Sequence, residues 1–406
     1  MKKFLLTLLL SSFSLFGVVE LGVDVFFQDQ YFNSLKGNRI GLITNHTGVN
    51  KNLQSTVELF KQKGMPFTFS AIFCPEHGLN GVAYAWEKVS HSAEVSGIPV
   101  YSLHGKTRRP TSKMLEGIDV LIYDIQDVGV RCYTYATTLY YAMEEAAKRG
   151  IQVIVLDRPN PMTGEVIDGV MLEDKWRSYV GYVNVPFCHG MTIGELAEFF
   201  NQEYHIKCDL KVIPMKGWTR GMSFQDTGLS WIPTSPHIPE ADTPLYYATT
   251  GIIGELGLVN MGVGYSMPFK LIGAQWINAN LLAEKLNAQK LPGVVFTPFH
   301  YRPFYGSFRA KNLHGVLIRI TNPRTYKPCS VQFAILGILK SLYPSQVEPA
   351  LKSIKPLQKT GFCKAMGTDE VFSILTNEKY VVWKLIGYQK IEREKFALKR
   401  QKYLLY

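Results

Sequence analysis

Several signatures that mark common enzyme classes are missing from this chain of 406 residues. No Gly-x-Gly-x-x-Gly follows the first predicted strand and no Gly-x-x-x-x-Gly-Lys-[Ser/Thr] occurs. The loops that hold a pyrophosphate are therefore lacking, and we expect no nucleotide cofactor. The absence of a Gly-x-Ser-x-Gly elbow and of a His-Glu-x-x-His helix argues against serine hydrolases and zincins. The six cysteines show no Cys-x-x-Cys spacing, which argues against zinc knuckles and thioredoxin-like sites.

Long apolar runs are also scarce, and the exception is the N-terminus. Lys2 and Lys3 precede an apolar run over residues 4–19, a pattern typical of a signal peptide. We therefore expect export to the periplasm or the medium. Because the run lacks a clean small-x-small cleavage site, an uncleaved N-terminal anchor with peripheral membrane contact is the alternative. An oxidising compartment would permit a disulfide, although a core of free thiols fits the sequence equally well.

The composition is that of a globular protein, with 46% hydrophobic and 19% charged residues, and the length predicts two domains. The net charge of +11 favours acidic partners such as peptidoglycan, an anionic membrane surface or nucleic acid, without choosing between them. Much of this charge lies in residues 379–402, which we interpret as a helix with a solvated face.

The order of predicted elements indicates an α/β fold. From residue 37 to about residue 161, β-branched runs alternate with helical segments, most clearly at 54–64 and 133–150, which predicts a Rossmann-like domain with a parallel sheet. After residue 186 we expect a smaller α/β (α+β) domain facing the first across a cleft that holds the active site. Its predicted helices are 192–204, 279–288, 329–342, 368–376 and 381–397, and its strands 210–214, 294–297 and 316–321. The expected division is 1–19 (signal peptide or anchor), 20–185 and 186–406.

Four strand-like runs in the first half, at 39–44, 67–73, 119–123 and 152–156, end in chemically capable side chains. If these strands are parallel neighbours, the four clusters lie on the edge of the sheet where open α/β folds bind ligands. In chain order, the clusters are Asn45 and His46, then Glu76 and His77, then Asp124, Gln126 and Asp127, and finally Asp157, Arg158 and Asn160.

The second cluster, Pro75-Glu76-His77-Gly78, carries the strongest catalytic signal. A partly desolvated carboxyl at Glu76 suits a general acid, whereas the structural alternative is a helix N-cap or an ion pair. His77 could orient Glu76 or bind substrate, but an isolated histidine is more often structural.

The third and fourth clusters are richer in polar groups and less specific. We expect at least two of Asp124, Asp127, Tyr133 and Tyr135 to contact substrate, although Asp127 could simply form the turn. The prolines beside Arg158 and Asn160 fix the directions of these side chains, which suits a binding loop or a rigid linker.

A metal site is the weaker chemical alternative. His46, His77, Asp124 and His189 are side chains that a metal accepts, but they lie far apart in the sequence with no ligand spacing to support a site. We expect no metal.

These motifs, in this order, resemble the NamZ-like exo-β-N-acetylmuramidases, a glycoside hydrolase family that releases terminal N-acetylmuramic acid from peptidoglycan fragments. The specific matches are 123–135, with its Asp-Ile-Gln-Asp-Val-Gly block, and 156–161, with Asp-Arg-Pro-Asn-Pro. Weaker matches are 41–48, 75–78, 189–192 and 214–218. The resemblance implies a Rossmann-like domain plus a smaller domain, no cofactor, Glu76 as the catalytic glutamate, and a muramyl saccharide rather than nucleic acid as partner. It leaves the oligomeric state open.

Five positions depart from the family pattern. Tyr84 and Trp86 replace an acidic residue and a glycine, Cys188 replaces an arginine, and Leu258 and Val263 replace an asparagine and an arginine. A buried substrate carboxylate without its cation costs several kcal/mol, so the departures raise the question of whether the substrate differs. A catalytically altered homologue that binds cell-wall saccharides is the alternative function.

The resulting hypothesis is a glycosidase with two carboxylates. Glu76 is the predicted general acid/base and Glu255 its partner, with Asp124 or Asp127 as alternatives to Glu255. A separation of about 5 Å between the two carboxyls predicts retention of configuration, and about 6.5 to 9.5 Å predicts inversion. The side chains expected to line the pocket are Asn45, His46, His77, Asp124, Asp127, Tyr133, Tyr135, Arg158, Asn160 and His189.

Overall fold

A seven-stranded sheet forms the first half of the molecule. The computed structural model describes residues 17–84, 87 and 94–406, so most of the expected signal segment lies outside the described residues. The strand order is β3-β4-β2-β1-β5-β6-β7, and every neighbouring pair is parallel except β3 and β4. The strands are β1 (Arg39–Thr44), β2 (Thr68–Cys74), β3 (Glu94–Val95), β4 (Ile98–Ser102), β5 (Val120–Asp124), β6 (Gln152–Leu156) and β7 (Leu210–Ile213). The predicted α/β architecture with a mostly parallel sheet is confirmed.

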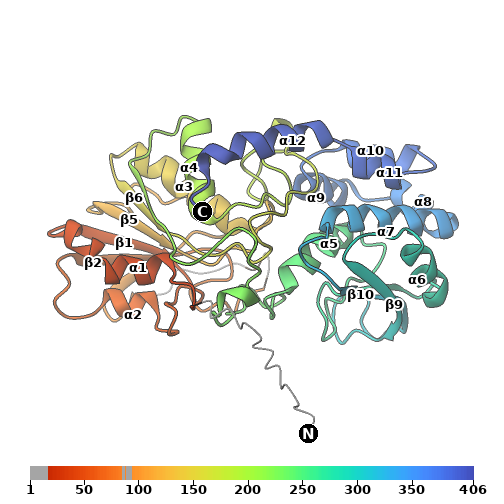
Figure 1. Ribbon diagram of the computed structural model, residues 1–406, viewed down its shortest axis with the longest axis horizontal. Helices are drawn as coiled ribbons and strands as arrows, with labels where there is room; N and C mark the ends of the chain where they lie inside the picture. Colours follow the sequence, from red (N-terminus) through yellow and green to blue (C-terminus); the bar gives the residue numbers. More distant parts are fainter. Residues whose placement is uncertain (1–16, 85–86, 88–93) are drawn as a thin grey trace, which may run out of the picture.

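Successive residues of the central strands face opposite sides of this sheet and enter two separate cores. In β5, Val120 and Ile122 pack in one core, whereas Leu121 and Tyr123 pack in the other. This alternation is the geometry of a strand buried on both faces, which explains why these runs are almost continuously apolar. Helices α1 (Gly22–Gln28) and α2 (Thr56–Phe60) cover one face, and α3 (Thr134–Ala147) and α4 (Ile193–Glu203) cover the other (Figure 1).

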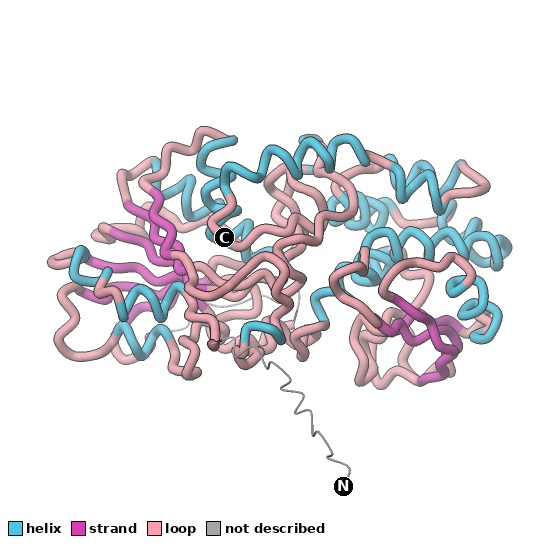
Figure 2. Tube along the Cα trace, viewed as in Figure 1, coloured by secondary structure: helices cyan, strands magenta, loops and turns pink. Residues whose placement is uncertain are grey.

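The second half of the chain forms a smaller antiparallel sheet packed against helices (Figure 2). Its strand order is β8-β10-β9, with β8 (Leu271–Ala274), β9 (Val294–Tyr301) and β10 (Leu313–Ile320). The helices are α5 (Thr243–Glu255), α6 (Ala279–Asn287), α7 (Pro328–Leu342), α8 (Pro344–Lys352), α9 (Pro356–Met366), α10 (Glu370–Asn377), α11 (Val382–Gly387) and α12 (Lys390–Lys399). One hydrophobic core continues from the α3 face of the large sheet into this half.

The boundary between the two halves differs from the expected division at residue 185. Strand β7 pairs with β6 in parallel, so the large sheet extends to Ile213. The sequence alone suggested otherwise because β7 has only four residues and follows the loops after residue 161.

The C-terminal helix predicted over 381–397 is wrong, because the chain forms two helices there. Gln389 takes a left-handed backbone conformation, with φ of 53°, between α11 and α12. Arg393 donates to the carbonyl oxygens of Ile386 and Tyr388, which satisfies the end of α11. The chain then returns along α12 to the large domain, where Phe396 packs against Phe199 of α4 (Figure 1).

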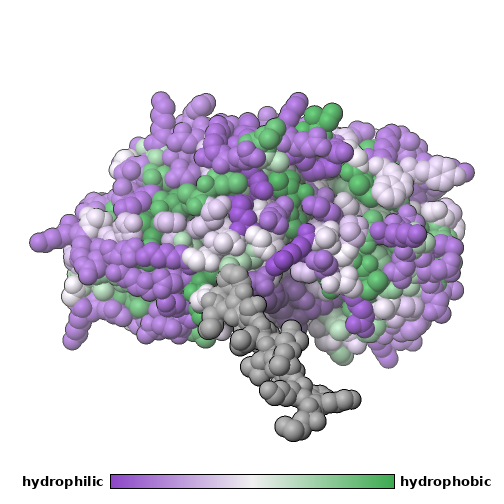
Figure 3. Space-filling view, in the orientation of Figure 1, coloured by the Kyte–Doolittle hydropathy of each residue, from purple (hydrophilic) through white to green (hydrophobic). Residues whose placement is uncertain are grey.

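The surface is mainly hydrophilic, and apolar side chains reach it over α12, where Ile391 and Leu398 are exposed (Figure 3). Within the described ranges we find no helix with the length and apolar character needed to cross a bilayer.

Candidate active site

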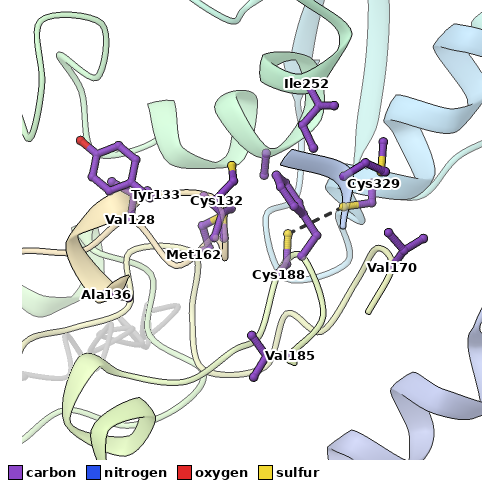
Figure 4. Packing of buried hydrophobic residues seen from close by; sticks show 14 of the residues in the cluster. Val128, Cys132, Tyr133, Ala136, Met162, Val170, Val185, Cys188, Ile252 and Cys329 are labelled. Carbon is purple, nitrogen blue, oxygen red and sulfur yellow. Dashed lines mark hydrogen bonds between the residues drawn. The ribbon is translucent and has the colours of Figure 1, made fainter. Parts of the chain in front are cut away.

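A cavity of about 280 Å³ lies between the edge of the large sheet and the second domain. Its walls come from both halves of the chain: the segment after β2, the start of α3, the segment around residue 237, and helices α5 and α9. Cys132 and Tyr247 join the two sides, with Sγ and the phenol oxygen 3.3 Å apart. Figure 4 shows three of the lining residues, Cys132 and Tyr133 before α3 and Ile252 on α5.

Glu76 lies in this cavity just after β2 and is 6% exposed. Thr134, at the start of α3, donates its hydroxyl proton to Glu76 Oε2 at 2.7 Å. His104 Nε2 lies 3.9 Å from Glu76 Oε1. Burial lowers the pKa of His104, against the opposing pull of the Glu76 charge, which favours a neutral imidazole. The carboxyl is therefore oriented by a hydroxyl and an uncharged ring while it faces the cavity.

His77 lines the same cavity in a strained backbone conformation. Its φ is 71°, in the left-handed region that is uncommon for residues other than glycine. Its Nδ1 lies 2.7 Å from the carbonyl oxygen of Ala83, and because a carbonyl only accepts, Nδ1 carries the proton. The bond fixes the imidazole beside Glu76.

Glu255 lines the same cavity from the second domain, at the C-terminal end of α5. The residue as a whole is exposed. Nearby protein atoms nevertheless exclude part of the water around its carboxyl, and this desolvation raises its pKa above the ordinary value. A Cβ added at Gly361 of α9 would stand 3.4 Å from Glu255 Oε2, so α9 passes close to this carboxylate. The structure thus brings the two predicted glutamates to one cavity from different domains.

Asp124 and Arg158, two other predicted substrate ligands, bind each other instead. Arg158 Nε donates to Asp124 Oδ1 at 2.6 Å, and Thr56 donates to Asp124 Oδ2 at 2.5 Å. Both members of the pair are buried, and Arg158 also donates to the carbonyl oxygen of Val49. This ion pair ties the loops after β1, β5 and β6 together, and neither residue is among the described residues that line the cavity.

Asp127 and Asn160 shape the neighbouring turn. Asp127 Oδ2 accepts from the Gly129 backbone N–H, and burial raises the pKa of Asp127 to about 7. Gly129 has a φ of 83°, and a Cβ there would stand 2.3 Å from Asn160 Oδ1, so only glycine fits. Asn160 itself bonds to the backbone of Met162 and Met191. These side chains build the turn that carries Tyr133 and Thr134 to the cavity.

One segment that leads into the cavity wall, around Pro233 and Thr234, is held by three of the predicted site residues, which the sequence did not reveal. They are His46, Tyr133 and Tyr135. His46 Nε2 donates to the Pro233 carbonyl at 2.6 Å, and the hydroxyls of Tyr133 and Tyr135 donate to Thr234. The three side chains therefore hold the segment that brings Ser235 and His237 into the cavity wall. Of the three, Tyr133 also lines the cavity, while Asn45 beside them accepts from both the backbone and the hydroxyl of Thr47.

His189 lies away from the cavity in the protein core. Burial, together with Arg400 and Arg131, lowers its pKa to about 3, and its Nδ1 accepts from the Met191 backbone. Within the described ranges, no three or more His, Cys, Asp or Glu side chains group so as to hold a metal. Of the four side chains weighed as metal ligands, Asp124 is paired with Arg158 and His189 lies in the core, whereas His46 and His77 lie near each other.

The departures from the family pattern fall in different places. Cys188 is fully buried, with Sγ 3.9 Å from Cys329 Sγ, as Figure 4 shows, and all six cysteines are free and buried. Leu258 packs against the core, whereas Val263 lines the cavity. Tyr84 is 61% exposed, and Trp86 lies outside the described residues.

Sequence reasoning missed several side chains at the cavity, above all His104, Thr134, His237 and Lys364. His104 follows β4, which pairs with β2, so a fifth polar strand end was present but its strand was not recognised. Thr134 lay within the conspicuous 123–135 run beside two tyrosines. Nothing in the local sequence marks His237 or Lys364, since each reaches the cavity from a distant segment.

Comparisons with known proteins agree with this architecture. Family models described as the N-terminal and C-terminal parts of exo-beta-N-acetylmuramidase NamZ match residues 40–242 and 245–406. The chain is 40% identical over 389 residues to the peptidoglycan beta-N-acetylmuramidase NamZ of Bacillus subtilis (strain 168), covering 96% of this chain and 91% of that one.

Two solved structures of DUF1343 family proteins from Bacteroides fragilis NCTC 9343 are also similar. One has a TM-score of 0.89 at 39% identity, and the other has 0.73 at 27% identity. Each covers 96% of this chain and 99% of the other. With both halves matched in order by the family models, the chain belongs to the exo-β-N-acetylmuramidase NamZ family and is a glycosidase.

Proposed function

We propose that this protein releases terminal N-acetylmuramic acid from peptidoglycan fragments and takes part in cell-wall turnover. The observation that carries the proposal is that Glu76 and Glu255, which come from different domains, line the same cavity. Glycoside hydrolysis through an oxocarbenium-like transition state needs two carboxyl groups flanking the bond. The similarity to the Bacillus subtilis enzyme, named for its action on peptidoglycan, supports the substrate class.

In the proposed mechanism, Glu76 is the general acid/base. It protonates the glycosidic oxygen as the bond to the departing sugar breaks, and later accepts a proton from the attacking water. Thr134 and neutral His104 hold the carboxyl in position without adding a positive charge beside it. Glu255, which lines the same cavity, is the second carboxylate, and it stabilises or attacks the developing cation.

Lys364 supplies the cation for the lactyl carboxylate of muramic acid in this proposal. It is the sole lysine or arginine among the described residues that line the cavity, and it lies on α9 with Gly361 and Ala365. Within the described ranges its ammonium forms no ion pair with a protein carboxylate. A substrate carboxylate can therefore pair with it without displacing a protein partner.

A chromogenic β-N-acetylmuraminide tests the activity. The wild-type protein should release the chromophore, Glu76→Gln should not, and exhaustive chelation should leave the rate unchanged. Glu58→Gln is the matched control, since Glu58 is a solvent-exposed residue of α2 that pairs with Lys61. Tight binding of the glycoside without release by the wild-type protein would contradict the proposal and favour a saccharide-binding role.

Export of this protein is part of the proposal. It is supported by Lys2 and Lys3 ahead of the apolar run in residues 4–19, and by a substrate that lies outside the cytoplasm. Fusing residues 1–30 to an alkaline phosphatase that is active only outside the cytoplasm should give activity, and replacing Leu8 and Leu9 by arginine should abolish it. Activity that survives this change would overturn export through this segment.

A further inference from the structure

Three aromatic rings form a row beside the cavity, in which the middle ring lines the cavity and the two outer rings are exposed. Tyr84 follows the loop after β2, His237 belongs to the segment held by His46, and Tyr305 lies in the loop between β9 and β10. The ring centroids of Tyr84 and His237 are 6.3 Å apart, as are those of His237 and Tyr305. The successive ring planes differ by only 31° and 25°.

A hydrogen bond fixes how two of these rings meet. His237 Nε2 and the Tyr305 phenol oxygen are 2.7 Å apart. Both atoms lie in the planes of their own rings, so the bond joins the rings end to end rather than face to face. With planes only 25° apart, the imidazole and the phenol are nearly parallel, and the hydrogen bond places them edge to edge.

The row is continuous with the cavity and open to solvent at its outer rings. His237 is a lining residue together with Glu76 and Glu255, whereas Tyr84 is 61% and Tyr305 47% exposed. Exposed aromatic rings beside a mostly apolar cavity that holds a few polar groups are a typical sign of a ligand-binding surface. Burial and the nearby His77 lower the pKa of His237, which favours the neutral imidazole.

We propose that Tyr84, His237 and Tyr305 form a second saccharide subsite, which stacks against the sugar attached to the departing side of the scissile bond. The C–H face of a pyranose is weakly positive and matches the negative face of an aromatic ring. An enzyme that removes one terminal sugar encloses that sugar in the cavity, so the rest of the glycan leaves through the rim. This inference rests on the proposed muramidase function, and its occupant is the neighbouring N-acetylglucosamine.

Two substrates that differ only in the departing group distinguish binding at this subsite from binding in the cavity. One is the disaccharide of N-acetylmuramic acid β-linked to N-acetylglucosamine, and the other is β-N-acetylmuramyl fluoride, whose leaving group has no ring to stack. Tyr84→Ala and Tyr305→Ala should each lower kcat/KM for the disaccharide about two- to tenfold and leave the fluoride unchanged. Tyr84→Trp, which restores a ring, should recover the disaccharide rate. Tyr380→Ala is the matched control, because Tyr380 is an exposed ring, 78% accessible, outside the described cavity lining.

The outcomes of this experiment distinguish a failure of the proposed subsite from a failure of the proposed muramidase function. Loss for the disaccharide alone supports the subsite. An unchanged rate ratio, or an equal loss for both substrates, overturns it while leaving the muramidase function intact. If the wild-type protein cleaves neither substrate, the proposed function itself fails. Because Tyr84 and Tyr305 are exposed, their truncation leaves the core intact, and equal melting temperatures of the variants check this.

Discussion

Glu76, just after β2, and Asp124, the last residue of β5, are buried carboxylates at the same edge of one sheet. Both oxygens of Asp124 are occupied by protein donors, Arg158 and Thr56, and none of its surface is exposed. Glu76 accepts from Thr134 but lines the cavity. A carboxylate enclosed by its partners holds loops together, whereas one that faces a cavity can exchange a proton with a ligand. At this edge of the sheet, the segment after β2 presents a carboxyl to the cavity, and we call it the chemical part. The ends of β5 and β6 carry the ion pair that holds the loops together, and we call them the structural part.

The largest expected effect tests the chemical part. Glu76→Gln keeps the volume and the acceptor for Thr134 but removes the exchangeable proton. The rate on a β-N-acetylmuraminide should fall by about 10²- to 10⁴-fold, which is the usual contribution of a general acid/base. Thermal unfolding should be nearly unchanged. A large loss of stability with the activity per folded molecule preserved would place Glu76 in the structural part instead.

Breaking the buried ion pair tests the structural part. Arg158→Gln leaves Asp124 as a buried charge without its cation, so we expect the free energy of unfolding to fall by about 3–5 kcal/mol. Urea denaturation followed by tryptophan fluorescence measures the loss. The double variant Asp124→Asn with Arg158→Gln carries no lone charge and should lose less. Near-wild-type stability of the single variant would show that the pair does not hold these loops.

The pH dependence of stability sharpens the comparison at Asp127. Its folded pKa of about 7 lies above the usual 3.8, so the folded state binds the extra proton between these values. This group therefore stabilises the fold below about pH 4, and its contribution is lost as the pH rises through 7, at most about 1.4 kcal/mol per pH unit. Asp127→Asn should remove that decline.

The difference between the Asp127→Asn and wild-type stability curves isolates this effect. His189, with a folded pKa of about 3 against a usual 6.5, acts in the opposite direction and is common to both proteins. A flat difference curve between pH 4 and 7 would mean that Asp127 is ionised in the folded protein.

The smallest expected effect concerns substrate choice. Lys364→Gln should reduce the preference for a β-N-acetylmuraminide over the matching β-N-acetylglucosaminide, which lacks the lactyl carboxylate, by about tenfold, as for one partly screened ion pair. Lys359→Gln is the control on the same helix, since Lys359 packs over Phe372. An equal loss on both glycosides would remove Lys364 from carboxylate recognition.

Local pattern predicted the elements that have clear periodicity. The strands β1, β2, β5 and β6 and the helices α3 and α4 match the expected segments to within a few residues, because each is buried along a regular face. Helix α5 was missed, since its sequence is rich in threonine, tyrosine and glycine, which favour helix weakly, and tertiary burial overrides that preference. The break at Gln389 depends on Arg393 and so was not visible either.

Of the predicted site residues, four line the cavity: Glu76, His77, Tyr133 and Glu255. The others are polar residues of similar types, most of them at or just after the end of a strand, but the structure pairs them with protein groups. His46 and Tyr135, for example, hold the segment that carries His237. Satisfaction of a polar group by a distant partner cannot be read from spacing, because the partner lies many residues away.

The sequence by itself determined the parallel sheet, the family motifs and the position of Glu76 after a buried strand, because these depend on short-range alternation and fixed spacing. Tertiary structure decided which strand end opens to a cavity and which is closed by an ion pair. It also brought Glu255, Lys364 and the three aromatic rings to that cavity from segments far along the chain. A cavity is the space left by packing two domains, and packing depends on contacts that no local pattern encodes.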